Sequence, residues 1–186
     1  MLFQIFSLLL QVATGLVAGM CLLRLYLQLQ RINLSPFSGN PMTPLIFALT
    51  NWIVLPLRRV LPALGRWDTA SLVSAFLVLL TKYILLWWAV GSSIDPVNLP
   101  IQALLELVST AVSGVMWMVI IYAVLSWVHS HSPMMFLLSD MVEPLLRPVR
   151  RIVPRVGGLD LSPVWLMVLL QVVEIVLSHL TPLLFV

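Results

Sequence analysis

Pairs of arginines occur twice in this sequence, each within the same frame of two prolines, a glycine and an aspartate. The first frame covers residues 56–68 and the second covers residues 148–160, at an offset of 92 residues. Guanidinium groups bind phosphates and carboxylates through paired hydrogen bonds. The sequence therefore offers four candidate residues for docking a lipid headgroup or a partner protein, which are Arg58, Arg59, Arg150 and Arg151.

Anchoring of the chain at the membrane surface is a simpler interpretation of the same arginines. Each basic residue close to an anionic surface contributes about 1 kcal/mol to membrane binding. A specific docking site is favoured by the repetition of the whole frame, because anchoring alone does not require the prolines, the glycine or the aspartate. Both interpretations stay open at the level of sequence.

The frame also carries residues that suit a turn into a following helix. Gly65 and Gly157 can adopt the left-handed backbone conformation that a tight turn needs. Asp68 and Asp160 stand just before apolar stretches, where their carboxylates would complement the amino-terminal end of the next helix. We expect these four residues to form a turn and helix-cap motif.

Lys82 and Glu174 fall inside apolar stretches, where a charge is costly unless it faces protein or water. The two residues are separated by the same 92 positions as the two frames. Equivalent positions of two repeats lie at the same depth, so we expect an ion pair, direct or bridged through a polar neighbour, where the second and fourth membrane helices meet. In an alternative interpretation, Lys82 extends to the surface past two tryptophans while Glu174 is protonated or faces a neighbour. A path for ions or protons is the third interpretation.

Other chemistries lack the residues that they require. The chain has one cysteine, Cys21, so we expect no internal disulfide and no thiolate metal site. His129 and His131 stand two positions apart and would not share a face of a helix, which argues against a metal or haem site. We find no paired-histidine zinc motif, phosphate-binding glycine loop or activated nucleophile, and therefore expect no enzyme and no cofactor.

The composition requires lipid as the solvent for most of the chain. Of the 186 residues, 61% are hydrophobic and 9% are charged, with a mean hydropathy of +1.07. A helix crosses a hydrocarbon core of about 30 Å with roughly 20 residues. The sequence predicts an all-α membrane protein with four such helices, at about residues 3–29, 70–90, 101–128 and 161–186.

These helices are arranged as two parallel repeats in our interpretation. The first repeat covers residues 1–95 and the second covers residues 96–186. Each consists of a membrane helix, an amphipathic segment and a second membrane helix, with the amphipathic segments at about 41–61 and 133–153. We expect these segments to lie in the interface with a polar edge toward water, or to re-enter the bilayer where Pro144 and Pro148 interrupt the helix.

The distribution of basic residues predicts the topology. Eight of the ten lysines and arginines follow the first or third membrane helix, and Arg24, at the end of the first, is expected to extend toward the same surface. The two frames are therefore expected in the cytoplasm, with both termini outside. The net charge of +3 follows from this topology and does not indicate nucleic-acid binding. Small residues at Gly15 and Gly19 predict close helix packing, within the chain or in a homo-oligomer.

The sequence resembles the YggT family of bacterial inner-membrane proteins over nearly its whole length. The resemblance is carried by the twice-occurring frame, with Ser35-Pro36-Phe37-Ser38 and the stretch from Asp140 to Pro148 in support. This chain has a longer stretch than usual between Phe37 and the first arginine pair. The family includes YlmG proteins and a chloroplast factor for cytochrome b6f assembly. The resemblance implies roles in osmotic stress, potassium uptake, haem-protein assembly or division, and it supplies no catalytic residue.

Two classes of function follow from these patterns. We favour a non-enzymatic scaffold or assembly factor, whose partners are anionic membrane lipids and other membrane proteins. The alternative is a component of ion uptake, with potassium as the ion. A transporter needs a polar path through the membrane, and the polar residues in the apolar stretches of this chain are sparse.

Overall fold

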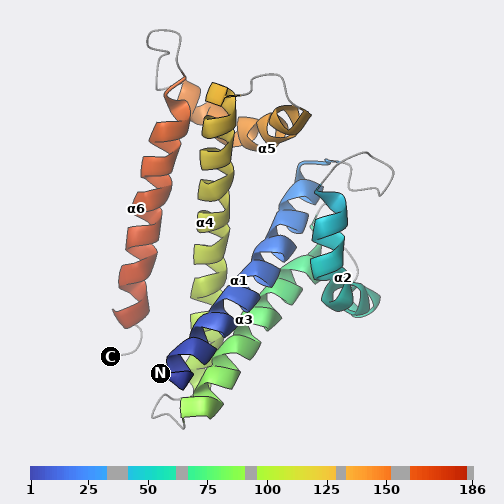
Figure 1. Ribbon diagram of the computed structural model, residues 1–186, viewed down its shortest axis with the longest axis vertical. Coiled ribbons are helices and arrows are strands. Elements are labelled where there is room, and N and C mark those ends of the chain that lie inside the picture. The colour runs from blue at the N-terminus through green and yellow to red at the C-terminus, as the bar shows by residue number, and fades with distance from the viewer. Residues whose placement is uncertain (33–41, 62–66, 91–95, 129–132, 152–159, 184–186) are drawn as a thin grey trace. The chain divides into compact units, whose positions relative to one another are not determined.

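The computed structural model describes residues 1–32, 42–61, 67–90, 96–128, 133–151 and 160–183. Within these ranges the elements are helical (Figure 1), and they run in the order α1 (Leu2–Leu29), α2 (Thr43–Val60), α3 (Thr69–Val90), η1 (Pro96–Asn98), α4 (Leu99–Val128), α5 (Pro133–Arg150) and α6 (Ser162–Leu183). Four helices, α1, α3, α4 and α6, are long and apolar enough to cross a membrane. For the described residues, the prediction of an all-α fold with four helices long and apolar enough to cross a membrane is therefore confirmed.

Hydroxyl side chains in these apolar helices bond to their own backbone. Ser74 donates to the carbonyl of Ala70 at 2.6 Å, and Thr81 donates to the carbonyl of Leu77 at 2.7 Å. In lipid no water is present to satisfy a hydroxyl group, and a helix carbonyl four residues earlier is the nearest acceptor. These residues therefore remain compatible with a membrane helix.

The chain divides into two compact units, one covering residues 1–111 and the other beginning at Val112. The division falls inside α4, whereas the sequence repeats meet at residue 95. A compact unit is defined by packing and a repeat by sequence, so the predicted repeat boundary stays a prediction.

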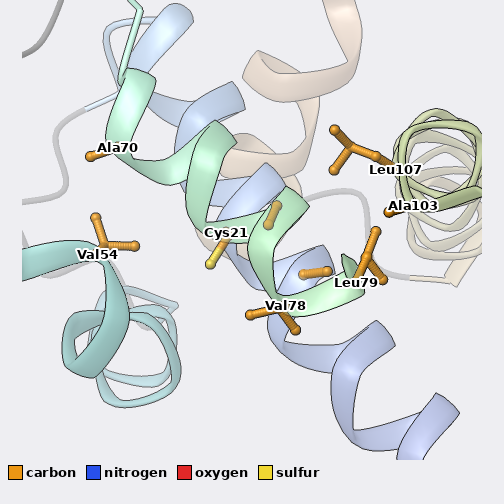
Figure 2. Close-up of a cluster of buried hydrophobic side chains, with 9 residues drawn as sticks. Cys21, Val54, Ala70, Val78, Leu79, Ala103 and Leu107 are labelled. Carbon is orange, nitrogen blue, oxygen red and sulfur yellow. The ribbon is translucent and has the colours of Figure 1, made fainter. Parts of the chain in front are cut away.

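The core of unit 1 lies between α1, α3 and the first turns of α4, and Val54 of α2 also belongs to it (Figure 2). Cys21 of α1 is fully buried in this core and acts there as a small apolar residue. Short side chains such as Ala70 and Ala75 let helix backbones approach closely, which is how membrane helices gain van der Waals contact. Gly15 and Gly19 do not take part, because a methyl group added at either position would meet nothing within 4 Å among the described residues.

Unit 2 contains the rest of α4, α5 and α6, and α5 lies across the ends of the other two helices (Figure 1). One face of α5 is buried, and its residues recur at the spacing of helical turns. They are Leu138, Met141, Val142, Leu146 and Val149. The helix runs without a break through Pro144 and Pro148, so the prolines do not interrupt it as the sequence suggested.

Candidate functional site

The first arginine frame forms a junction between α2 and α3. Arg58, in the last turn of α2, places Nη2 2.5 Å from Oδ2 of Asp68, the residue before α3. Ser71 of α3 donates its hydroxyl to the same carboxylate at 2.6 Å. The Asp68 side chain is 1% exposed, so these partners replace the water that would otherwise bind its carboxylate. We call Arg24, Arg58, Asp68 and Ser71 the first junction.

Arg24 joins α1 to this junction. Its Nε lies 3.9 Å from Asp68, and its Nη1 donates to Thr50 and Asn51 of α2, at 2.8 Å in each case. The guanidinium also lies 4.9 Å from the centre of the Phe47 ring. Arg24 is 3% exposed. The expectation that Arg24 extends toward the surface was therefore wrong, because polar groups of α2 give it partners inside the protein.

The electrostatics of Asp68 keep its carboxylate ionised. Burial alone would raise the pKa of Asp68, but hydrogen bonds from Arg58 and Ser71 and the charges of Arg58 and Arg24 outweigh burial. The pKa of Asp68 therefore lies below its usual value. Removing either arginine would leave a buried carboxylate with too little compensation.

The second frame forms a corresponding junction between α5 and α6. Arg150, the last residue of α5, binds Asp160 through Nε at 2.9 Å and through Nη2 at 2.8 Å. Its Nη1 lies 2.5 Å from the carboxylate of Glu143 in the same helix. Its Nη2 donates to the Tyr122 hydroxyl of α4 at 3.4 Å. We call Glu143, Arg150 and Asp160 the second junction.

Two carboxylates determine the pKa of the arginine in the second junction. Burial would lower the pKa of Arg150, but the neighbouring charges of Asp160 and Glu143 raise it above its usual value. Burial would likewise raise the pKa of Asp160, but hydrogen bonds from Ser162 and the charge of Arg150 lower it.

The two junctions have opposite charge ratios. In the first, one carboxylate lies between the guanidinium groups of Arg24 and Arg58. In the second, one guanidinium lies between the carboxylates of Glu143 and Asp160. Sequence reasoning found the shared arginine and aspartate but missed Arg24 and Glu143. Glu143 could have been found, because it stands seven residues, about two helical turns, before Arg150 and so shares its face.

The aspartates of both junctions lie at the amino-terminal ends of membrane helices. The Asp68 carbonyl accepts the backbone N–H groups of Ser71 and Leu72 in the first turn of α3. The Asp160 carboxylate accepts the N–H of Ser162, the first residue of α6, at 3.0 Å. Negative charge at this end of a helix is favourable, because the unpaired N–H groups carry partial positive charge. Gly65 and Gly157, the predicted turn residues, lie outside the described residues.

The second arginine of each pair takes no part in its junction. Arg59 and Arg151 are exposed, and neither makes a hydrogen bond or ion pair with another residue in the described part of the chain. Arg58 and Arg150 bind the aspartates instead. The sequence proposed all four as docking residues, whereas the geometry leaves two of them available on the surface.

The charged residues within the membrane helices have partners other than those expected. Lys82 is 5% exposed and forms an ion pair with Glu106 of α4, within unit 1. Glu174 accepts a hydrogen bond of 2.7 Å from Ser113, within unit 2. The structure therefore replaces the expected Lys82–Glu174 pair with two separate contacts.

The succession of α3 and α4 in the chain explains the partner of Lys82. Lys82 stands eight residues before the end of α3, and Glu106 stands seven residues after the start of α4. At 1.5 Å per residue, Lys82 lies about 12 Å before the end of α3 and Glu106 lies about 11 Å after the start of α4. Two successive helices that run in opposite directions therefore bring these residues to the same depth.

The described residues offer no constellation for a metal ion. No group of three His, Cys, Asp or Glu side chains suited to a metal occurs within them. His129 and His131 lie outside the described ranges. The two junctions fix helix ends by ion pairing. Beside each junction lies one exposed arginine, Arg59 or Arg151, that has no ion-pair partner among the described residues.

Comparison with known proteins identifies the family of the chain. Residues 2–89 and 101–181 match the family model described as CCB3/YggT. The chain is 38% identical over 136 residues to a protein of Escherichia coli K12 named "Uncharacterized protein YggT", covering 73% of this chain and 71% of that one. It is 34% identical over 174 residues to an uncharacterised protein of Pseudomonas aeruginosa, covering 91% and 86%. No solved structure matches.

Proposed function

Because this chain belongs to the CCB3/YggT family, we propose that it is a non-enzymatic scaffold or assembly factor for other proteins of the bacterial inner membrane. Four membrane-type helices support its place in a membrane. The observation that carries the scaffold proposal is the outer face of α5, where Asp140, Arg147 and Arg151 are exposed while Arg150 beneath them is held by carboxylates. A fixed helix with exposed charges of both signs suits specific contact with a partner protein.

The proposal includes two parallel repeats with the junctions in the cytoplasm and both termini outside. Support comes from the matching order of elements, since α2 and α5 each have 18 residues and α3 and α6 each have 22. In each half an arginine binds the aspartate ten residues later. We further propose that the scaffold serves the cell under osmotic stress, which rests on the family resemblance.

Site-specific crosslinking in cells tests the scaffold. A photoreactive amino acid is placed at Asp140 on α5 or at Arg151 directly after its end, and at Val172 on α6 as a matched control that is also exposed. A scaffold gives the same discrete protein adducts at both α5 positions and none at Val172, where lipid is the neighbour. Adducts at no position, or equally at all three, would contradict the proposal.

Potassium uptake remains the second candidate, and the polar groups within the membrane helices favour it. Lys82, Glu106 and Glu174 are the residues that an ion path would use. Purified protein in liposomes with a potassium gradient tests this function beside the Lys82→Met and Glu174→Gln variants. Protein-dependent flux that changes in the variants supports transport, and a tight bilayer supports the scaffold.

A further inference from the structure

The helices α2 and α5 bury and expose equivalent positions. Compared at the offset of 92 residues, both helices bury Ile46 and Leu138, Thr50 and Val142, and Val54 and Leu146. Both also expose a common set of positions, which are 44, 48, 52, 55, 56 and 59 in α2, and 136, 140, 144, 147 and 148 in α5 with 151 directly after its end. The two helices therefore present equivalent faces to their surroundings.

The residues on these equivalent faces differ in polarity. Asp140 and Arg147 on α5 correspond to Ala48 and Leu55 on α2. Trp52 of α2 is 62% exposed and stands where α5 has a proline. The outer face of α2, formed by Leu45, Ala48, Trp52, Leu55, Pro56 and Arg59, is thus apolar up to its last turn, whereas that of α5 carries charge along its length.

The polar residues of α2 turn inward instead. Thr50 and Asn51 receive hydrogen bonds from Arg24, which is itself buried. An apolar outer face, with the polar residues turned inward among apolar ones, is the reverse of a helix that faces water. It matches a helix whose outer side meets hydrocarbon and whose inner side meets protein.

We propose that the outer face of α2 lies in the lipid monolayer and that Arg59, at its end, binds the phosphate of an anionic phospholipid. The indole N–H of Trp52 supports insertion, because it donates to the Leu49 carbonyl of its own helix at 2.7 Å and so needs no water. Trp67 is 56% exposed and directly precedes Asp68, to which the end of α2 is bound. Aromatic rings at that level are typical of the headgroup region.

Charge identifies the ligand at the end of this face. Arg59 is exposed and has no carboxylate partner among the described residues, whereas its neighbour Arg58 is taken by Asp68. A guanidinium without a protein partner at the level of lipid headgroups binds a phosphodiester through paired hydrogen bonds. The membrane that surrounds α1 and α3, on which α2 packs, supplies that lipid. This inference stands independently of the scaffold proposal.

Fluorescence quenching tests the insertion of α2. The chain has seven tryptophans, so a variant that keeps Trp52 alone, with phenylalanine at the other positions, reports on this face. It is reconstituted in liposomes whose phosphatidylcholine and phosphatidylglycerol carry bromine on the acyl chains. The matched control has its single tryptophan at the equivalent position of α5, through Pro144→Trp.

Lipid contact predicts that bromine quenches Trp52 several times more strongly than the tryptophan introduced by Pro144→Trp, and that aqueous acrylamide shows the reverse order. Strong quenching of Trp52 by acrylamide would overturn the proposal, because the face would then meet water. Protection of Trp52 from both quenchers would overturn it too, because a protein would then cover the face.

A second measurement concerns the headgroup. Spin-labelled lipids report how strongly the protein selects phosphatidylglycerol over phosphatidylcholine, in the wild type and in the Arg59→Gln and Arg151→Gln variants. We expect Arg59→Gln to reduce the relative affinity for phosphatidylglycerol about fivefold, and Arg151→Gln to leave it close to that of the wild type. An equal effect of both variants, or none of Arg59→Gln, would overturn the assignment of the phosphate to Arg59.

Discussion

Single residues of the two junctions make the same contact in different surroundings. The Asp68 side chain is 1% exposed and lies between two arginines, whereas the Asp160 side chain is 26% exposed and shares one arginine with Glu143. The energy of an ion pair depends on how much water each partner has lost. The two aspartates are therefore equivalent in sequence but not in their importance for stability.

Replacing each aspartate by asparagine measures this difference. Asp68→Asn leaves the buried guanidinium of Arg24 and the half-buried one of Arg58 without a counter-charge, so we expect a loss of about 3–5 kcal/mol in the free energy of unfolding. Asp160→Asn, at a partly hydrated site, is expected to cost about 1 kcal/mol. Thermal unfolding of the detergent-solubilised protein, followed by circular dichroism, measures both. Equal losses would show that burial does not control these ion pairs.

The pKa of Asp68 gives the junction a dependence on pH. Because the pKa of Asp68 is lower in the folded protein than in the unfolded chain, its contribution to stability is present above the unfolded pKa, about 3.9, and is lost as the pH falls through the folded value. We expect the melting temperature of the wild type to fall below about pH 4 more steeply than that of Asp68→Asn. Parallel curves for the two proteins would place the acid sensitivity elsewhere.

Lys82 and Glu106 allow a test by double substitution. Lys82→Met leaves Glu106 without its ion-pair partner in an apolar core, and we expect a loss of about 3–5 kcal/mol or lower abundance in the membrane. Adding Glu106→Gln should restore most of that loss. The matched control adds Glu174→Gln to Lys82→Met, and it should restore nothing, because Glu174 bonds to Ser113. Rescue by Glu174→Gln instead would revive the pair first expected from sequence.

At the scale of helices, the packing of unit 2 depends on the buried face of α5. Leu146 is fully buried, so Leu146→Ala is expected to cost about 2–5 kcal/mol and to raise hydrogen exchange along α5. Phe136→Ala is the control, because Phe136 is 62% exposed on the opposite side of the helix. Exchange rates measured by mass spectrometry should rise only in the first variant.

The elements were predictable from sequence because hydropathy and length decide them. The predicted spans at 3–29, 70–90 and 101–128 differ from α1, α3 and α4 by two residues at most. Partners across helices were not predictable in the same way. The Lys82–Glu174 pair was inferred from the symmetry of the repeats, but the short connection between α3 and α4 brought Glu106 closer. Arg24 was missed because its acceptors, Thr50 and Asn51, lie on a helix whose orientation the sequence did not reveal.

The whole molecule is predicted to place both junctions on one side of the membrane. Cys21 is the only cysteine in the chain, so Cys21→Ala gives a background without thiols. In that background, Arg59→Cys and Arg151→Cys should react with an impermeant maleimide only from the cytoplasm. Val97→Cys, in η1 and 78% exposed, should react only from outside. Reaction of the two arginine positions from opposite sides would exclude parallel repeats.

The course of α4 through both compact units bears on how such a protein arose. Ala103 and Leu107, from the first turns of α4, complete the core formed by α1 and α3 (Figure 2). In the proposed repeats, these residues come from the opening helix of the second copy. An ancestor with a single copy would have left the α3 surface uncovered, and a second molecule would have had to supply the missing helix. On the proposed duplication, fusion of two gene copies would have placed that covering helix in the same chain.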